Sequence, residues 1–384
     1  MAGDDAYPLA LCYGPGERIR WPDANVLAYL EGLLRVLAET TEAEIDQGRW
    51  SRQVKTLDGC VDYRLSLPAL LEPLDARPAS RRPVLDRRAM ERATAELQRF
   101  VAQSEFKSLE QVQDAIRRRF SGSLDAIPST ASTPLEQAQD MAYRAFDARG
   151  RRRVQLARKA IELSGDCADA YVILAEHAGD LERARDLYAQ GVAAGERALG
   201  PQAFEEEAGH FWGLMTTRPY MRARFGLAET LEALGRADEA IDHYRELLRL
   251  NPGDNQGVRD RLLPALLVQG RDEEAGALLR QFSGESSAVW RYGAALLAFR
   301  REGDSPAARA SLRRALRANR HVLDYLTGEQ QLPGADPPAY ELGSEEEAII
   351  CARALAGAWR TTPGAVEWAR AAARPGTRAK RRKR

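Results

Sequence analysis

The feature that most constrains this chain is a pattern of small and large side chains that returns about every 34 residues. The most regular copy spans residues 221–254. Its second half places Ala240, Tyr244 and Leu247 on one face of a predicted helix, and Gly235 supplies a turn before that helix. Small residues let two helices approach closely, while large ones fill the space beside them. The pattern therefore predicts an antiparallel pair of helices.

The same small–large pattern occurs in four further copies between residues 134 and 320. These copies carry Ala157 and Ala160; Ala184, Tyr188 and Gly191; Ala275, Leu279 and Phe282; and Ala308, Leu312 and Ala315. Five helix pairs in series resemble tetratricopeptide (TPR) repeats, which stack into a superhelix or solenoid. We therefore predict a mostly α, TPR-like fold over residues 134–320. The alternative is an unrelated helical bundle with a core of Ala and Leu.

The segments before the repeats predict a different organisation. Residues 61–67 alternate apolar and polar side chains, which is typical of a half-buried strand, whereas residues 26–37 carry apolar residues at helical spacing. We therefore expect a small α or α+β module over residues 1–71. Residues 72–133 are expected to form a linker rich in Pro and Arg together with connecting helices, the first ending near Gln103 and another running from about 109 to 120.

The segments after the repeats predict a cap and a tail. Ser344 and Glu347 have the spacing of a capping box, and Thr362 begins a final helix. A solenoid needs a terminal element that covers its last apolar face, so we expect residues 321–373 to form a capping helix pair. Residues 374–384 hold seven Lys or Arg and no acid, and we expect a basic disordered tail.

Composition and charge exclude several classes of protein. The chain has 56 basic and 56 acidic side chains, so without the tail the remainder carries 49 basic and 56 acidic groups. A mildly acidic body does not match a nucleic-acid-binding domain. The four cysteines lie far apart, which argues against a zinc site or a disulfide framework. The N-terminus is acidic, and no apolar run approaches the roughly 18 residues of a membrane span. We expect a cytoplasmic protein.

No pattern in the sequence points to catalysis. A phosphate-binding loop, a dinucleotide fingerprint and a nucleophile elbow are all absent. The histidines have no second ligand at helical spacing, and the acidic runs at 205–207 and 345–347 lie where acids favour a helix N-terminus. We predict no enzyme activity, no metal and no cofactor.

Candidate binding residues follow from the geometry of stacked helix pairs. The first helix of each pair lines the concave side, where ligand-facing positions recur near the second, fifth, ninth and twelfth residue of a repeat. We expect Trp290 to act as an apolar anchor and the arginines to pair with acidic groups of a partner. The alternative is that the charged residues form a solvated face and that Trp290 packs between repeats. The candidate residues are Arg222, Phe225, Glu229, Glu232, Asp260, Trp290, Arg300 and Arg301.

Several segments carry a more specific resemblance. The stretch 157–176 (ARKAIELSGDCADAYVILAE), the stretch 319–326 (NRHVLDYL) and the later 343–349 (GSEEEAI) and Trp359 resemble the suppressor-of-tumorigenicity family, number seven of that name, and related bacterial TPR proteins. The resemblance covers about 134–370 and implies a scaffold. Arg320 stands where the family usually has proline. Animal members carry apolar spans after the repeats, whereas this chain carries a basic tail, so the resemblance does not imply a membrane location here.

Three functional hypotheses follow. The first is a protein-interaction scaffold that binds a peptide or partner protein in the concave face of the repeats. The second is a nucleic-acid-associated protein that uses the basic tail, because clustered Lys and Arg attract phosphate. The third is an enzyme or enzyme subunit whose site lies in the N-terminal module.

Overall fold

The computed structural model describes residues 9–12, 54–57, 60–63, 87–104, 111, 115, 129–337 and 339–373. The chain divides into two compact units, Met1–Gly226 (unit 1) and Leu227–Arg384 (unit 2). The division falls inside helix α10 (Arg218–Ala233). The domain boundaries expected from the sequence stay predictions.

Unit 1 contains a small antiparallel sheet. Its strands β1 (Leu9–Cys12), β2 (Val54–Leu57) and β3 (Cys60–Tyr63) lie in the order β1–β3–β2. Tyr63 pairs with Leu9 on one side and with Val54 on the other. A single strand cannot be stable alone, so the strand expected from residue 61 onward needed partners, and β1 and β2 supply them. Residues 64–67, the helix expected over 26–37 and most of the one expected over 109–120 lie outside the described residues.

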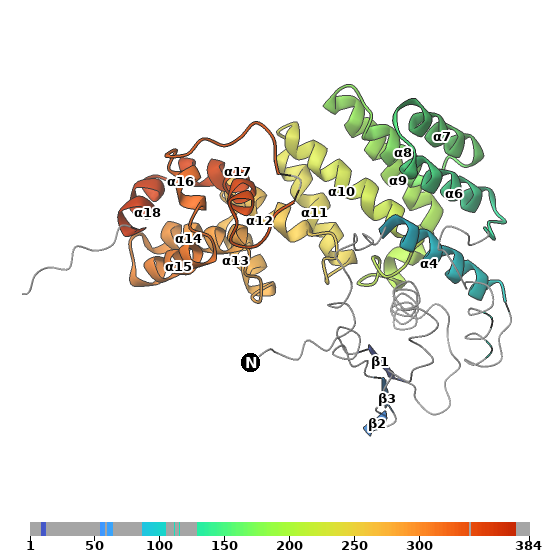
Figure 1. Cartoon of the computed structure of the whole chain (residues 1–384), viewed down its shortest axis with the longest axis horizontal. Coiled ribbons are helices and arrows are strands. Elements are labelled where there is room, and N and C mark those ends of the chain that lie inside the picture. The colour runs from blue at the N-terminus through green and yellow to red at the C-terminus, as the bar shows by residue number, and fades with distance from the viewer. Residues whose placement is uncertain are drawn as a thin grey trace, which may run out of the picture. The chain divides into compact units, whose positions relative to one another are not determined.

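Among the described residues of unit 1, α4 is followed by consecutive helical hairpins (Figure 1). Thr133 and Glu136 form the expected capping box at the first hairpin, with the Thr133 side chain accepting from the Glu136 amide and Pro134 in the first turn. This arrangement satisfies amide groups that the helix itself leaves unpaired. The elements are α4 (Arg87–Ala102), α6 (Pro134–Asp147), α7 (Gly150–Leu163), α8 (Ala168–Ala175), α9 (Leu181–Glu206) and the first part of α10.

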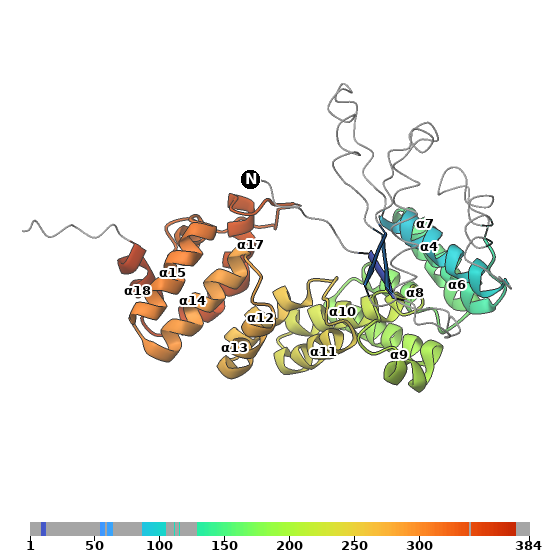
Figure 2. The same cartoon turned by 90° about the horizontal axis from the view of Figure 1, so that it is seen from below.

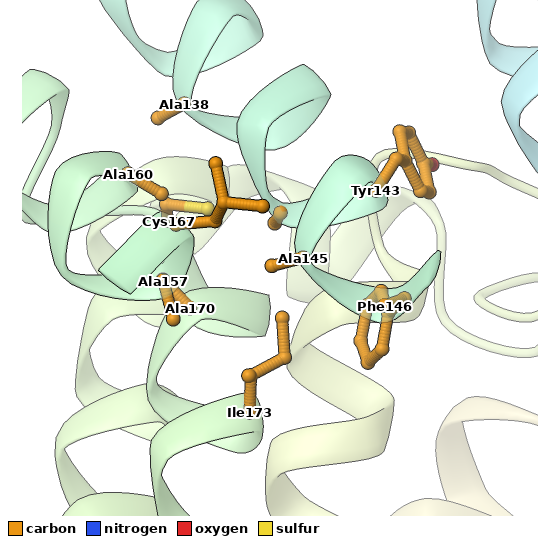
Figure 3. Packing of buried hydrophobic residues seen from close by; sticks show 11 residues of the cluster. Ala138, Tyr143, Ala145, Phe146, Ala157, Ala160, Cys167, Ala170 and Ile173 are labelled. Atoms are coloured by element: carbon orange, nitrogen blue, oxygen red, sulfur yellow. The ribbon is translucent and has the colours of Figure 1, made fainter. Parts of the chain in front are cut away.

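Small residues set the helix spacing in unit 1. Figure 3 shows alanines of α6, α7 and α8 facing one another around the sulfur of Cys167, while Tyr143 and Phe146 project from a different side of α6. At the crossing of α9 and α10, a Cβ atom on Gly195 would come within 2.8 Å of the Tyr220 Cβ atom. Larger side chains there would force the helices apart, which explains why the repeats carry Gly and Ala at these positions.

Unit 2 repeats the hairpin design. Gly235 has a φ angle of 78°, and the Arg236 amide donates to the Leu231 carbonyl at 2.8 Å. Gly270 ends the first helix of the following hairpin in the same way, with the Arg271 amide donating to the Leu266 carbonyl at 2.9 Å. These are Schellman turns, which need a left-handed residue and therefore favour glycine. The hairpin helices are the end of α10 with α11 (Ala237–Leu250), α12 (Val258–Val268) with α13 (Asp272–Gln281), and α14 (Ala288–Glu302) with α15 (Pro306–Ala318).

Three further helices complete unit 2, namely α16 (Val322–Leu326), α17 (Glu345–Thr361) and α18 (Ala365–Ala373) (Figure 1). Trp359 of α17 is fully buried. Its ring lies 6.3 Å from Tyr292 and 6.4 Å from Trp368, and Trp368 stacks on Phe299 at 4.5 Å. Aromatic burial of this kind joins α17 and α18 to α14. The predicted fold class, mostly α with repeated helix pairs and a C-terminal capping pair, is confirmed.

Candidate functional site

Arg222 lies at the centre of a partly buried ionic cluster in unit 1. Its Nε and Nη2 atoms donate to the two carboxylate oxygens of Asp169 on α8, at 2.8 and 2.6 Å. Its Nη1 atom donates to Glu91 on α4 at 2.8 and 3.0 Å. Asp169 is fully buried, and Gln139 of α6 donates to it at 2.6 Å. Residues from α4, α6, α8 and α10 therefore meet at one guanidinium group.

The charge on Arg222 is strongly fixed. Burial disfavours that charge, yet the adjacent carboxylates of Asp169 and Glu91 outweigh burial and raise the pKa of Arg222. Burial, followed by the charge of Glu91, raises the pKa of Tyr143 well above its usual value, so the phenol stays protonated and donates to Glu91 at 3.4 Å. A bidentate arginine–carboxylate pair has a set orientation, so Asp169 aims the guanidinium at α4.

Helix α4 lies against the first helices of the unit 1 hairpins through further polar contacts. Arg88 donates to the Phe146 carbonyl at 3.2 Å, and its guanidinium lies 4.4 Å from the centre of the Phe146 ring. Arg99 pairs with Asp140 of α6 at 2.9 Å, while Glu96 accepts from the amide and hydroxyl of Thr130, each at 2.9 Å. The buried face of α4 comprises Met90, Ala93, Thr94, Glu96, Leu97 and Val101. The first helices of unit 1 thus hold a helix that belongs to none of their hairpins.

In unit 2, α17 lies against the first helices α12 and α14, and side chains hold both of its ends. At its C-terminal end, Arg300 of α14 donates to the Ala358 carbonyl at 3.2 Å and to the Thr362 hydroxyl at 2.8 Å. The same guanidinium donates to Leu267 O at 2.8 Å and pairs with Asp272 at 2.7 Å. All the hydrogen bonds that the structure gives Arg300 are therefore made within unit 2.

At the N-terminal end of α17, Glu347 has a wider role than the sequence predicts. Ser344 accepts from the Glu347 amide as expected for a cap. The Glu347 carboxylate, however, accepts from the first amide of α14, at Ala288, at 2.9 Å and from the side chain of Asn319 at 3.0 Å. It is 3% exposed and also accepts from Gly343. No local spacing could reveal a contact with a helix more than 50 residues away.

Three of the predicted binding residues lie together in unit 2 on a partly exposed surface, which we call the polar row and define as Glu229, Glu232, Asp260 and Arg261. Glu229 of α10 pairs with Arg261 of α12 at 2.7 Å. Glu232 accepts from the Tyr244 hydroxyl at 2.9 Å. The row therefore presents more carboxylates than cations, and its residues come from two successive first helices.

Burial shifts the pKa values of two carboxyl groups in the polar row. It raises the pKa of Glu229, and the pairing with Arg261 opposes this shift. Burial also raises the pKa of Asp260 to about 6, although Arg259 favours the charged form; the nearby carboxylates Glu285 and Asp254 raise it further. One carboxylate oxygen of Asp260 is buried without a hydrogen-bond partner. The row is therefore an acidic surface with incompletely compensated charge.

The other predicted binding residues are placed differently. Trp290 is 3% exposed and packs edge-on against Phe282 at 6.0 Å. Arg301 donates to the Asp272 carbonyl at 3.1 Å and lies 3.5 Å from Glu273. Phe225 is half-buried on α10. Within the residues that the structure describes, these side chains do not gather into one open site. Partner binding by any of the predicted residues stays a prediction.

The described residues also bear on metals, membranes and the cysteines. They contain no group of three or more His, Cys, Asp or Glu side chains placed to hold a metal ion. None of the helices in this part of the chain has the length and apolar content that crossing a bilayer requires. Cys167 and Cys351 are buried free thiols, and burial followed by the charge of Asp169 raises the pKa of Cys167 to about 12.

Comparison with known proteins gives a family and several relatives. The family described as ST7 protein matches residues 129–327. Proteins named suppressor of tumorigenicity 7 protein-like from Bos taurus and Homo sapiens are 31% identical over 238 residues, which is 56% of this chain and 42% and 41% of those proteins. The Danio rerio protein of that name is 29% identical over 235 residues, 56% of this chain and 40% of the relative. The chain thus spans less than half the length of these relatives.

Among solved structures, that of YrrB, a TPR protein with an unusual peptide-binding site, is similar to this chain with a TM-score of 0.33 and 20% sequence identity. The similarity covers 53% of this chain and 90% of YrrB.

Proposed function

The chain belongs to the ST7 protein family, and we propose that its helical hairpins form a non-catalytic scaffold that binds another polypeptide. One observation carries this proposal: the first helices of unit 1 hold the added helix α4 through an oriented, partly buried arginine and an apolar contact face. A surface that receives a helix within its own chain has the shape and chemistry to receive one from a partner. Repeated hairpins commonly serve as such surfaces.

The polar row of unit 2 is part of the same proposal. Its side chains are partly exposed, with Glu229 at 37% and Arg261 at 55% of the side chain. Its excess of carboxylates favours a partner segment that carries Lys or Arg. Trp290 and Arg300, which are occupied within unit 2, are not part of the proposed surface. We include a cytoplasmic location in the proposal, because four widely spaced cysteines suit a reducing compartment.

Site-specific photocrosslinking in the cells that produce the protein tests this function. A benzophenone amino acid replaces Glu229 or Arg261 in the polar row. The matched control is Arg313, an exposed residue of the second helix α15. We expect both row positions to yield an adduct with the same polypeptide and Arg313 to yield none.

Two results would contradict the proposal. One is the absence of any polypeptide adduct at the row positions. The other is recovery of nucleic acid that disappears when residues 374–384 are deleted, because that result would favour the basic tail as the binding element. A third variant combines Glu229→Lys with the benzophenone amino acid in place of Arg261. Reversal of the charge at residue 229 should lower the yield of the adduct with a basic partner.

A further inference from the structure

Helix α4 precedes the capped hairpins of unit 1 and is held by side chains of α6 and α10. The helices α6 to α9 pack as consecutive hairpins, and α4 contacts the first of them through α6. It runs beside α6 in both views (Figure 1 and Figure 2) and sends Glu91 between Tyr143 and Arg222. Its contacts with α6 and α10 therefore combine a buried apolar face with an oriented ion pair.

The receptor for Glu91 is held in place without α4. Arg222 keeps its two hydrogen bonds with Asp169, and Gln139 in turn holds Asp169. Arg218 lies 3.5 Å from Glu91 and also donates to the Trp212 carbonyl at 2.8 Å, a contact made within its own segment. Removal of α4 would thus leave an oriented, positively charged carboxylate receptor. A pre-organised receptor binds more tightly because little ordering remains to be done on binding.

We infer that α4 is an exchangeable occupant of this face, and that the face takes a helix of a partner polypeptide that carries a carboxylate at the position of Glu91. This inference rests on the proposed scaffold function and names the chemistry of its partner. The apolar positions of α4 set the rest of the pattern. They are Met90, Ala93, Leu97 and Val101, which recur at the spacing of one helical face.

The pattern specifies the partner in chemical terms. The partner helix needs an apolar residue directly before its acid, a small residue two positions after the acid, and apolar residues at the two following turns. The small residue corresponds to Ala93, which is fully buried. The acid fixes the orientation of the partner helix, because a guanidinium already paired with Asp169 offers only one further edge to a carboxylate.

Occupancy by α4 lowers the apparent affinity for such a partner. A segment tethered to its own receptor acts at an effective concentration of about millimolar. A partner helix binds only the fraction of molecules from which α4 has left, so its apparent dissociation constant rises by the inverse of that fraction. Weakening of α4 in the chain should therefore strengthen binding of a free helix with the same sequence.

A peptide-binding assay with the full chain tests this inference. The probe is a fluorescent peptide of residues 87–104, and its binding is measured by fluorescence anisotropy. The test variant is Glu91→Lys, which places a cation against Arg222 and so releases α4. The matched control is Glu162→Lys, the same change at an exposed position of α7. We expect the probe to bind Glu91→Lys at least about tenfold more tightly than it binds the wild-type or Glu162→Lys chains.

A second probe checks the carboxylate. A peptide with Glu91→Gln should bind the Glu91→Lys chain at least about tenfold more weakly than the wild-type peptide does, because it lacks the charge that Arg222 receives. Equal affinity of both peptides, or equal affinity of all chains, would overturn the inference. Circular dichroism establishes that the variant chain is folded, and Glu91→Gln in the chain replaces Glu91→Lys should the latter unfold. The assay needs no natural partner, so it can succeed or fail independently of the crosslinking experiment.

Discussion

Helix α4 of unit 1 and helix α17 of unit 2 each lie against first helices of their hairpins, yet different forces hold them. Residues Ala348, Cys351, Leu355 and Trp359 of α17 are fully buried or nearly so, and the Trp359 ring joins an aromatic cluster. Helix α4 buries fewer apolar side chains and adds the partly buried ion pair of Glu91 with Arg222.

The difference separates an integral helix from a bound one. Apolar burial stabilises α17 by about 25 cal/mol for each Å² of apolar surface removed from water. This free energy is lost when the helix leaves. The ion pair that holds α4 gains little net free energy, because the attraction of the charges must offset their desolvation. Charge complementarity instead gives α4 its orientation. We therefore expect unit 2 to need α17 to stay folded and unit 1 to tolerate departure of α4.

Truncation of the aromatic core of unit 2 should have the largest effect. Trp359→Ala removes the largest fully buried side chain and leaves a cavity between α14, α17 and α18. We expect a loss of about 4 kcal/mol in the free energy of unfolding, measured by urea titration followed by circular dichroism. The matched control is Leu342→Ala, because Leu342 is 68% exposed. A loss below about 1 kcal/mol would mean that α17 is not integral.

Removal of the carboxylate receptor in unit 1 should have the next largest effect. Arg222→Met leaves Asp169 buried beside Gln139 without its cation, which should cost about 3 kcal/mol in the free energy of unfolding. Arg197→Met is the matched control, since Arg197 pairs with Asp166 at 2.7 Å on an exposed surface, and it should cost less than about 1 kcal/mol. Equal losses in urea titrations would contradict the claim that burial makes the Arg222 pair essential.

Parts of these two units were predictable from the sequence because their signals are local. Thr133 and Glu136 lie three residues apart, and Gly235 marks its turn by itself. The sequence also marks Arg222 as a candidate binding residue, and partner binding by it stays a prediction. Its partners Asp169 and Glu91 lie 53 and 131 residues away, so no spacing rule connects them. The same limit explains why the sequence predicts Glu347 only as a capping residue, although its carboxylate binds the first amide of α14.

The polar row provides a smaller test that compares the open surface of unit 2 with the occupied one of unit 1. Burial raises the pKa of Asp260 to about 6, so the folded chain holds this proton more tightly than the unfolded chain does. The free energy of unfolding should therefore fall as pH rises from about 4 to about 6 and level off above that range. Asp260→Asn should remove this fall and add about 1 kcal/mol at pH 7, after allowance for partial exposure.

Urea titrations at a series of pH values measure this effect. Asp242→Asn changes a largely exposed carboxyl group of α11, with 74% of its side chain accessible, and should leave the pH dependence as in the wild-type chain. A wild-type slope that persists in Asp260→Asn would show that another group titrates. That result would contradict the interpretation that the polar row holds unsatisfied charge.

The substitution with the smallest effect on global stability should be Glu91→Gln. It removes the charge that pairs with Arg222 but leaves Asp169 paired, so the free energy of unfolding should change by less than about 1 kcal/mol. Amide hydrogen exchange of α4 should nevertheless accelerate by about tenfold, with no change in α17. The control is Glu346→Gln, which removes one carboxylate at an exposed position of α17. Unchanged exchange in α4 would show that Glu91 does not hold the helix.

Exchange of occupants requires that α4 leaves while the rest of unit 1 stays folded. Native-state hydrogen exchange at increasing urea concentrations below the unfolding midpoint measures this directly for each helix. We predict that α4 amides exchange through a low-energy opening with little dependence on urea, whereas amides of α6, α8 and α17 exchange only through large, urea-dependent unfolding. If the α4 amides instead follow the same urea dependence and free energy as those of α6 and α8, α4 is an integral part of unit 1 and the exchange of occupants is contradicted.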